Sequence, residues 1–220
     1  MSEQNKKIIA GLHRKDLTNI KFASALLDMA IEEKKDDLNF ALQQAKEVQQ
    51  IAAKESRKKN SIEFAILYWK ATLMLAPYFF EDFLYYMEKD RAPDKRFYMP
   101  RRRTLKVVVD DLQDLEDGKL DFYGLSMPPR VGKSTICIFF MAWVMGKRPN
   151  SHNAMSGHSG ILADGFYGEA LNLMELDVPE EKRQYHFLDI FPQTFLQKKS
   201  AEKKEVTLND PDRFATLTCR

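Results

Sequence analysis

A loop ending in Gly132-Lys133-Ser134 carries the residues best suited to chemistry in this chain. An apolar run, Phe122 to Met127, precedes the loop, and a second apolar run follows it from Ile136. The order of apolar strand, loop and apolar helix is typical of a P-loop. There, backbone N–H groups surround phosphates, the lysine contacts the β- and γ-phosphate oxygens and the hydroxyl binds Mg²⁺. The pattern therefore predicts a nucleotide-binding site.

The loop departs from the general G-x-x-x-x-G-K-[ST] pattern at its first position, where Met127 replaces the glycine. Pro128 and Pro129 have no N–H to donate. The N–H groups must then come from residues 130–135, at the start of the helix, where the helix dipole favours anions. We expect the nucleotide to be bound by the following residues: Pro129, Arg130, Val131, Gly132, Lys133, Ser134 and Thr135.

Three side chains of the loop have separate expected roles. Lys133 neutralises the β- and γ-phosphates, and Ser134 is the metal ligand. Arg130 precedes the lysine by three residues and points toward the position where charge develops on the γ-phosphate, as an arginine finger or phosphate sensor in cis does. A surface ion pair is the alternative for Arg130, and physical arguments alone leave it open. Arg130 and Lys133 are therefore the candidate catalytic residues.

Residues 1–95 are predicted to form a helical N-terminal region. Apolar residues recur there at helical spacing, and Asp36 and Asp37 are suited to cap the second helix. The basic cluster at the end of that helix, Lys54 to Lys59, is interpreted as a solvated helix end, with DNA contact as the alternative. The aromatic residues near position 80 are interpreted as core. The expected helices are Ile20–Ile31, Leu38–Ala52, Ile62–Ala76 and Tyr78–Lys89.

Residues 96–220 are predicted to form a P-loop ATPase core. A helix is expected at Arg101–Asp117, ending at Gly118. It includes Val107–Asp111, which resembles a Walker B strand but has the apolar spacing of a helix. The later segments alternate strand, loop and helix and predict an α/β fold, a partial P-loop NTPase with a parallel sheet flanked by helices. They are strand Phe122–Met127, helix Ser134–Met145 stopped by Gly146, strand Asn153–Ser156, helix Ser159–Met174, and a hairpin of Glu205–Leu208 and Arg213–Thr218 around Asn209–Asp212.

The bulk composition limits the classes of function. The chain has 220 residues and a formal net charge of only +2, so any binding of nucleic acid must depend on local patches. The most apolar run, Ile62 to Phe80, is interrupted by charges and by Pro77, and its uncharged parts fall short of the ~20 residues that a membrane helix needs. Cys137 and Cys219 have no metal-ligand spacing, which favours a reducing cytosol.

The loop resembles that of a known family. Residues 127–135, MPPRVGKST, are similar to the P-P-R-x-G-K-S form found in the large terminase subunits of tailed bacteriophages, the motors that package DNA into proheads. Residues 154–166, AMSGHSGILADGF, resemble the second strand and following helix of that family. Residues 189–192, DIFP, and 213–219, RFATLTC, fall where the family has an FP turn and a core strand. The resemblance spans Phe97 to Arg220.

The resemblance implies an ATPase that couples ATP hydrolysis to translocation of double-stranded DNA, followed by an RNase H-like nuclease. It implies ATP and Mg²⁺ at Lys133 and Ser134, and favours a catalytic role for Arg130. The implied partners are a portal protein and a small terminase subunit, with copies assembled as a ring in the cytoplasm of the bacterial host and no membrane. An upstream segment contacts adenine in such enzymes. Tyr98 and Arg101–Arg103 lie in that region, without an assignment.

The sequence contains neither a Walker B strand with its glutamate nor a nuclease carboxylate cluster, since Asp189 follows too short an apolar run. We therefore expect the N-terminal portion of a terminase, which binds nucleotide weakly and hydrolyses it poorly. Two alternatives remain open. One is another P-loop DNA motor, such as a helicase or recombinase-type ATPase. The other is a non-catalytic interaction module, in which residues 1–95 bind a partner and the ATPase half is vestigial.

Overall fold

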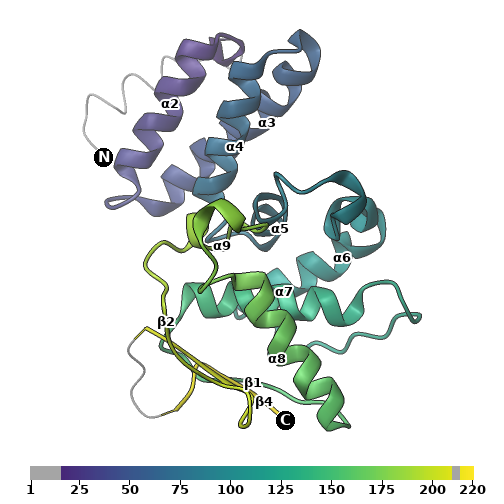
Figure 1. Cartoon of the computed structure of the whole chain (residues 1–220). Helices are drawn as coiled ribbons and strands as arrows, with labels where there is room; N and C mark the ends of the chain where they lie inside the picture. The colour runs from purple at the N-terminus through teal and green to yellow at the C-terminus, as the bar shows by residue number, and fades with distance from the viewer. Residues whose placement is uncertain (1–15, 210–213) are drawn as a thin grey trace. The chain divides into compact units, whose positions relative to one another are not determined.

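The computed structural model of the chain describes residues 16–209 and 214–220. The chain divides into two compact units, one ending at Tyr78 and the other comprising Phe79–Arg220. The described residues form eight α-helices and a small C-terminal sheet of four strands (Figure 1). The boundary expected between residues 95 and 96 falls inside the second unit, just before its longest helix. No helix in the described ranges is long and apolar enough to cross a membrane.

Three α-helices make up most of the first unit, and their sequence patterns explain where they begin. The side chains of Asn19, Asp37 and Ser61 accept N–H bonds from the first turns of the three helices, so the predicted cap at Asp37 is confirmed. Small residues on the middle helix, among them Ala41, Ala45 and Ala52, are fully buried and let its neighbours approach closely. The elements are η1 (Asp16–Thr18), α2 (Ile20–Glu33), α3 (Leu38–Lys59) and α4 (Ile62–Leu75).

The basic end of α3 is partly engaged by its own unit. Lys59 Nζ lies 2.9 Å from Glu55 Oε2 and donates to the carbonyl of Thr18 at 2.7 Å. That lysine therefore helps to hold the helix end, as cations near a helix C-terminus do. DNA contact by the cluster stays a prediction.

The second unit is built around an aromatic core at its central helix, α7. The Phe80 ring lies 5.3 Å from that of Trp143, and the Phe83 ring lies 6.5 Å from that of Phe139. The predicted core position is therefore confirmed for Phe80 and Phe83, and all four of these side chains are at most 1% exposed. The helices are α5 (Phe80–Met87), η2 (Pro93–Lys95), α6 (Tyr98–Glu116), α7 (Lys133–Lys147), α8 (Gly160–Met174), η3 (Glu180–Lys182) and α9 (Phe187–Ile190).

The sheet of the second unit is mixed. Its strands are β1 (Asn153–Met155), β2 (Leu196–Ser200), β3 (Glu205–Leu208) and β4 (Leu217–Cys219), in the order β1-β4-β3-β2. Only β1 and β4 are parallel, with Ala154 opposite Thr218; the other two pairs are antiparallel. The expected pairing of Glu205–Leu208 with the last strand is confirmed, whereas the turn residues Asp210–Asp212 lie outside the described ranges. The expected parallel sheet is wrong.

The strand expected at Phe122–Met127 is also wrong, because none of these residues belongs to a strand. An extended chain becomes a strand only when a neighbouring backbone supplies hydrogen-bond partners. Here β1 pairs with β4 instead, and the segment lies beside α6, where the Tyr123 hydroxyl donates to Asp111. The Phe122 side chain is 83% exposed. The described residues thus form a mostly helical protein with a small mixed sheet, and they do not show the P-loop fold.

Two glycines behave differently from one another. Gly118 follows α6 with a φ of +72° and ends it, as predicted. Gly146 does not stop α7, which continues to Lys147. A Cβ atom at Gly146 would lie 2.2 Å from Cδ2 of Phe191, so glycine at this position allows the Phe191 ring to pack closely against α7.

The residues Val107–Asp111 are helical, which confirms that they are not a Walker B strand.

Candidate nucleotide-binding site

The first turn of α6 is fixed by a buried carboxylate. Glu88 is 2% exposed, and it accepts hydrogen bonds from the backbone N–H groups of Phe97 at 2.8 Å and Tyr98 at 3.0 Å. Burial raises the pKa of Glu88, and these two bonds oppose the rise only in part. The Tyr98 hydroxyl donates to Glu81 at 2.7 Å, and burial together with this bond raises the pKa of Tyr98. Phe97 is therefore held at a defined position.

Phe97 and Gly132 are matched in shape. The Phe97 ring stacks on that of Phe139, with centres 5.5 Å apart and planes 14° from parallel. A Cβ atom at position 132 would lie 2.5 Å from Cε2 of Phe97. Gly132 also has a φ of +101°, which L side chains rarely adopt. Both constraints require glycine at position 132. The close contact of Phe97 with Gly132 places the start of α6 against the loop.

The start of α7 offers unused backbone donors. Gly132 is its N-cap residue, and its carbonyl accepts from Ile136 N at 2.9 Å. Within the described part of the chain, the N–H groups of Lys133, Ser134 and Thr135 have no hydrogen-bond partner. Such groups at a helix start attract anions.

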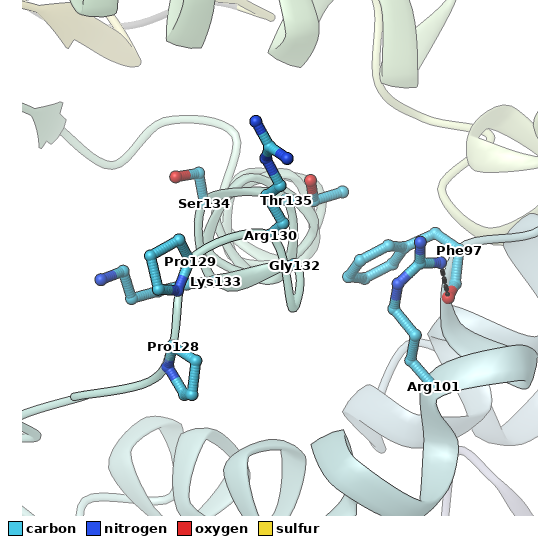
Figure 2. Close-up of a pocket in the computed structure, with 9 residues that line it drawn as sticks. All are labelled: Phe97, Arg101, Pro128, Pro129, Arg130, Gly132, Lys133, Ser134 and Thr135. Carbon is cyan, nitrogen blue, oxygen red and sulfur yellow. Dashed lines mark hydrogen bonds between the residues drawn. The ribbon is translucent and has the colours of Figure 1, made fainter.

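A pocket of about 380 Å³ surrounds this helix start (Figure 2). Its lining includes six of the seven residues predicted to bind nucleotide; Val131 is the exception. The lining contains no carboxylate. The lining residues are Phe97, Arg101, Pro128, Pro129, Arg130, Gly132, Lys133, Ser134 and Thr135.

The charged side chains of the pocket point in different directions. In Figure 2, Lys133 extends past Pro129, whereas Phe97 and Arg101 lie on the opposite side of the start of α7. Arg130 extends in a third direction. The hydroxyls of Ser134 and Thr135 also lie on opposite sides of the helix axis. The predicted residues therefore lie together at the start of α7, but the side chains of Arg130 and Lys133 do not point toward a common position.

The loop backbone carries strain at Arg130, which has a φ of +66°. A left-handed conformation costs a non-glycine residue about 1–2 kcal/mol. The side chain is exposed, and no carboxylate pairs with it, or with Lys133, in the described residues. The surface ion pair considered for Arg130 is therefore not seen there.

The residues fit a magnesium–nucleotide complex better than a bare metal ion. Mg²⁺ is bound by oxygen ligands and is usually shared with substrate phosphates. The pocket supplies only the hydroxyls of Ser134 and Thr135, and no cluster of three or more potential metal ligands occurs within the described ranges. If Mg²⁺ binds here, Ser134 would add one ligand to those of the phosphates.

The cysteine near the loop is not activated. Cys137 lies one turn into α7, and burial raises the pKa of its thiol, although the charge of Lys133 opposes this. The thiol is therefore protonated near neutral pH and unsuited to nucleophilic catalysis.

Of the residues considered upstream of the loop, Arg101 lines the pocket, whereas Tyr98 is buried and Arg102 pairs with Glu81. Phe97 was missed by the sequence interpretation. No local spacing links it to Gly132, because the two meet only in the folded chain, where the start of α6 lies against the loop.

Comparison of the chain with models of protein families, with characterised proteins and with solved structures found no match.

Proposed function

We propose that this protein binds a nucleoside triphosphate, with Mg²⁺, at the start of α7. The observation that carries the proposal is the pocket. There, among the residues that the structure describes, the N–H groups of residues 133–135 have no hydrogen-bond partner and lie beside cations without a carboxylate partner. A helix start with free donors binds phosphate, and lysine adds a counter-charge. The loop sequence of residues 127–135 favours a nucleotide over other anions.

We further propose that the chain is the ATP-binding portion of a phage DNA-packaging motor of the terminase large-subunit class. Support comes from the proline–arginine loop and from the order of the similar segments that follow it. Double-stranded DNA, a portal protein, a small terminase subunit and ring assembly belong to this proposal through the resemblance alone. Arg130 and Lys133 would act on the phosphates.

Hydrolysis by this chain should be slow. ATP hydrolysis needs a group that orients the attacking water, and the pocket lining contains no carboxylate. Binding is therefore the direct test of the proposal, and turnover is a secondary one.

The experiment is a titration of the purified chain with a fluorescent ATP analogue and Mg²⁺, with unlabelled ATP as competitor. Lys133→Ala should weaken binding at least tenfold, since charge-assisted hydrogen bonds contribute about 1.5–3 kcal/mol. Lys198→Ala is the control, because Lys198 is an exposed lysine of β2 in the same unit and outside the pocket. Equal affinities for the wild type and Lys133→Ala would contradict the proposed site.

A further inference from the structure

Arg101 differs from Arg102 and Lys106, two neighbouring cations on α6. Arg102 Nε lies 2.9 Å from Glu81, and Lys106 Nζ lies 3.7 Å from the same carboxylate and also pairs with Asp110. Arg101 pairs with no carboxylate in the described residues. Its Nη1 donates to the carbonyl of Phe97 at 3.0 Å. The charge of Arg101 is therefore uncompensated, although two acidic residues lie near the neighbouring cations.

The side chain of Arg101 passes directly beside the loop. Its Cδ atom lies 3.7 Å from the position that a Cβ atom would take at Gly132, and the residue lines the pocket. Only one of the five guanidinium N–H groups is used by the Phe97 carbonyl (Figure 2). The others remain available to a ligand, on the opposite side of the α7 start from Lys133.

The aromatic ring beside Arg101 offers little to a nucleotide base. Phe139 already stacks on Phe97, and the guanidinium carbon of Arg101 lies 5.5 Å from the centre of the Phe97 ring. The group that this side of the pocket presents is therefore a guanidinium. Its planar fork matches the oxygens of a phosphate group.

We propose that Arg101 is a ligand of the phosphate chain of the bound nucleotide and contacts it from α6, outside the loop. The proposal rests on the proposed nucleotide site and adds to it a second element that recognises phosphate. With Lys133 and Arg101 on opposite sides of the helix start, the pocket favours a chain of two or three phosphates over a single one.

The test measures the affinities of Mg-ATP, Mg-AMP and Mg-tripolyphosphate for the wild type and for Arg101→Gln. Glutamine keeps a donor for the Phe97 carbonyl while it removes the charge. Arg101→Lys keeps the charge without the fork, and Arg103→Ala removes an exposed arginine of the same helix that does not line the pocket. Circular dichroism checks that each variant is folded.

Arg101→Gln should lower the affinities for ATP and for tripolyphosphate by the same factor, about tenfold. It should change the affinity for AMP less. Arg101→Lys should recover part of the loss, and Arg103→Ala should match the wild type. A lower affinity for ATP with an unchanged affinity for tripolyphosphate would show a contact with the base and overturn the proposal. Unchanged affinities for both ligands would also overturn it. If Lys133→Ala is also without effect, the nucleotide site itself is wrong; if only Lys133→Ala weakens binding, the site stands and the role of Arg101 fails.

Discussion

At the scale of single residues, the loop depends on one glycine and one strained arginine. Gly132 combines a φ of +101° with a contact that leaves no room for a Cβ atom beside Phe97. Arg130 adopts a left-handed conformation that its side chain disfavours. Backbone strain of this kind persists where surrounding structure or function requires it.

Gly132→Ala should lower the free energy of unfolding by about 2 kcal/mol, because it adds both backbone strain and a clash. Urea unfolding measures this change. Gly165→Ala in α8 is the control, since a Cβ atom there meets nothing within 4 Å, and it should stabilise the helix by about 1 kcal/mol. Phe97→Ala combined with Gly132→Ala should relieve the clash and leave the strain; full additivity of the two losses would argue against the contact.

Arg130→Gly should have opposite effects on stability and on binding. Glycine relieves the left-handed strain, so the free energy of unfolding should rise by about 1 kcal/mol. Loss of the guanidinium should weaken ATP binding. Thermal unfolding and the ATP titration together measure both effects. A glycine variant that binds ATP as tightly as the wild type would leave Arg130 without a role at the nucleotide.

At the scale of elements, α6 is held at both ends. Glu88 binds the N–H groups at its start, and Glu116 at its end contacts Lys147 at 2.8 Å and Arg148 at 2.6 Å, at the end of α7. Burial alone would raise the pKa of Glu116, but Arg148 and Lys147 hold it below its usual range. Glu88 therefore fixes the start of α6, and with it Phe97, to the end of α5, while Glu116 ties the end of α6 to the end of α7.

The raised pKa of Glu88 predicts a distinctive pH dependence. Between the unfolded pKa, about 4.3, and the higher folded value, the folded state binds more protons than the unfolded state, so stability falls as pH rises. Glu88→Gln cannot ionise and should lose this component. Urea unfolding from pH 4 to pH 7 should therefore show the variant becoming more stable relative to the wild type as pH rises. A constant difference across that range would contradict the assignment.

Local patterns predicted most helices and the strands β1 and β3, but not the mixed topology of the sheet. Helix spacing and caps such as Asp37 are encoded within a few residues, and Val107–Asp111 was recognised as helix by spacing alone. The strand at Phe122–Met127 was not predictable, because an extended run becomes a strand only where a distant segment pairs with it. For the same reason, six of the seven loop residues of the pocket were predicted from the sequence, whereas the contact of Phe97 with Gly132 depends on the start of α6 lying against the loop.

At the scale of the whole molecule, the chain places its two tryptophans in different units. Trp69 belongs to the first unit, and Trp143 lies in the core of the second, fully buried beside Phe80. Each single-tryptophan variant therefore reports on one unit. The pocket belongs to the second unit alone, so a ligand bound there should stabilise mainly the unit that contains Trp143.

The most direct measurement of the central claim is urea unfolding of Trp69→Phe, followed by the fluorescence of Trp143 with and without Mg-ATP. ATP at about 100 times its dissociation constant should stabilise the second unit by about 2.7 kcal/mol. With Lys133→Ala added, a tenfold or greater loss of affinity should reduce this shift to about 1.4 kcal/mol or less at the same ATP concentration. With Lys198→Ala the full shift should persist. An undiminished shift with Lys133→Ala, or the absence of any shift in the wild-type loop at saturating ATP, would contradict nucleotide binding at the start of α7.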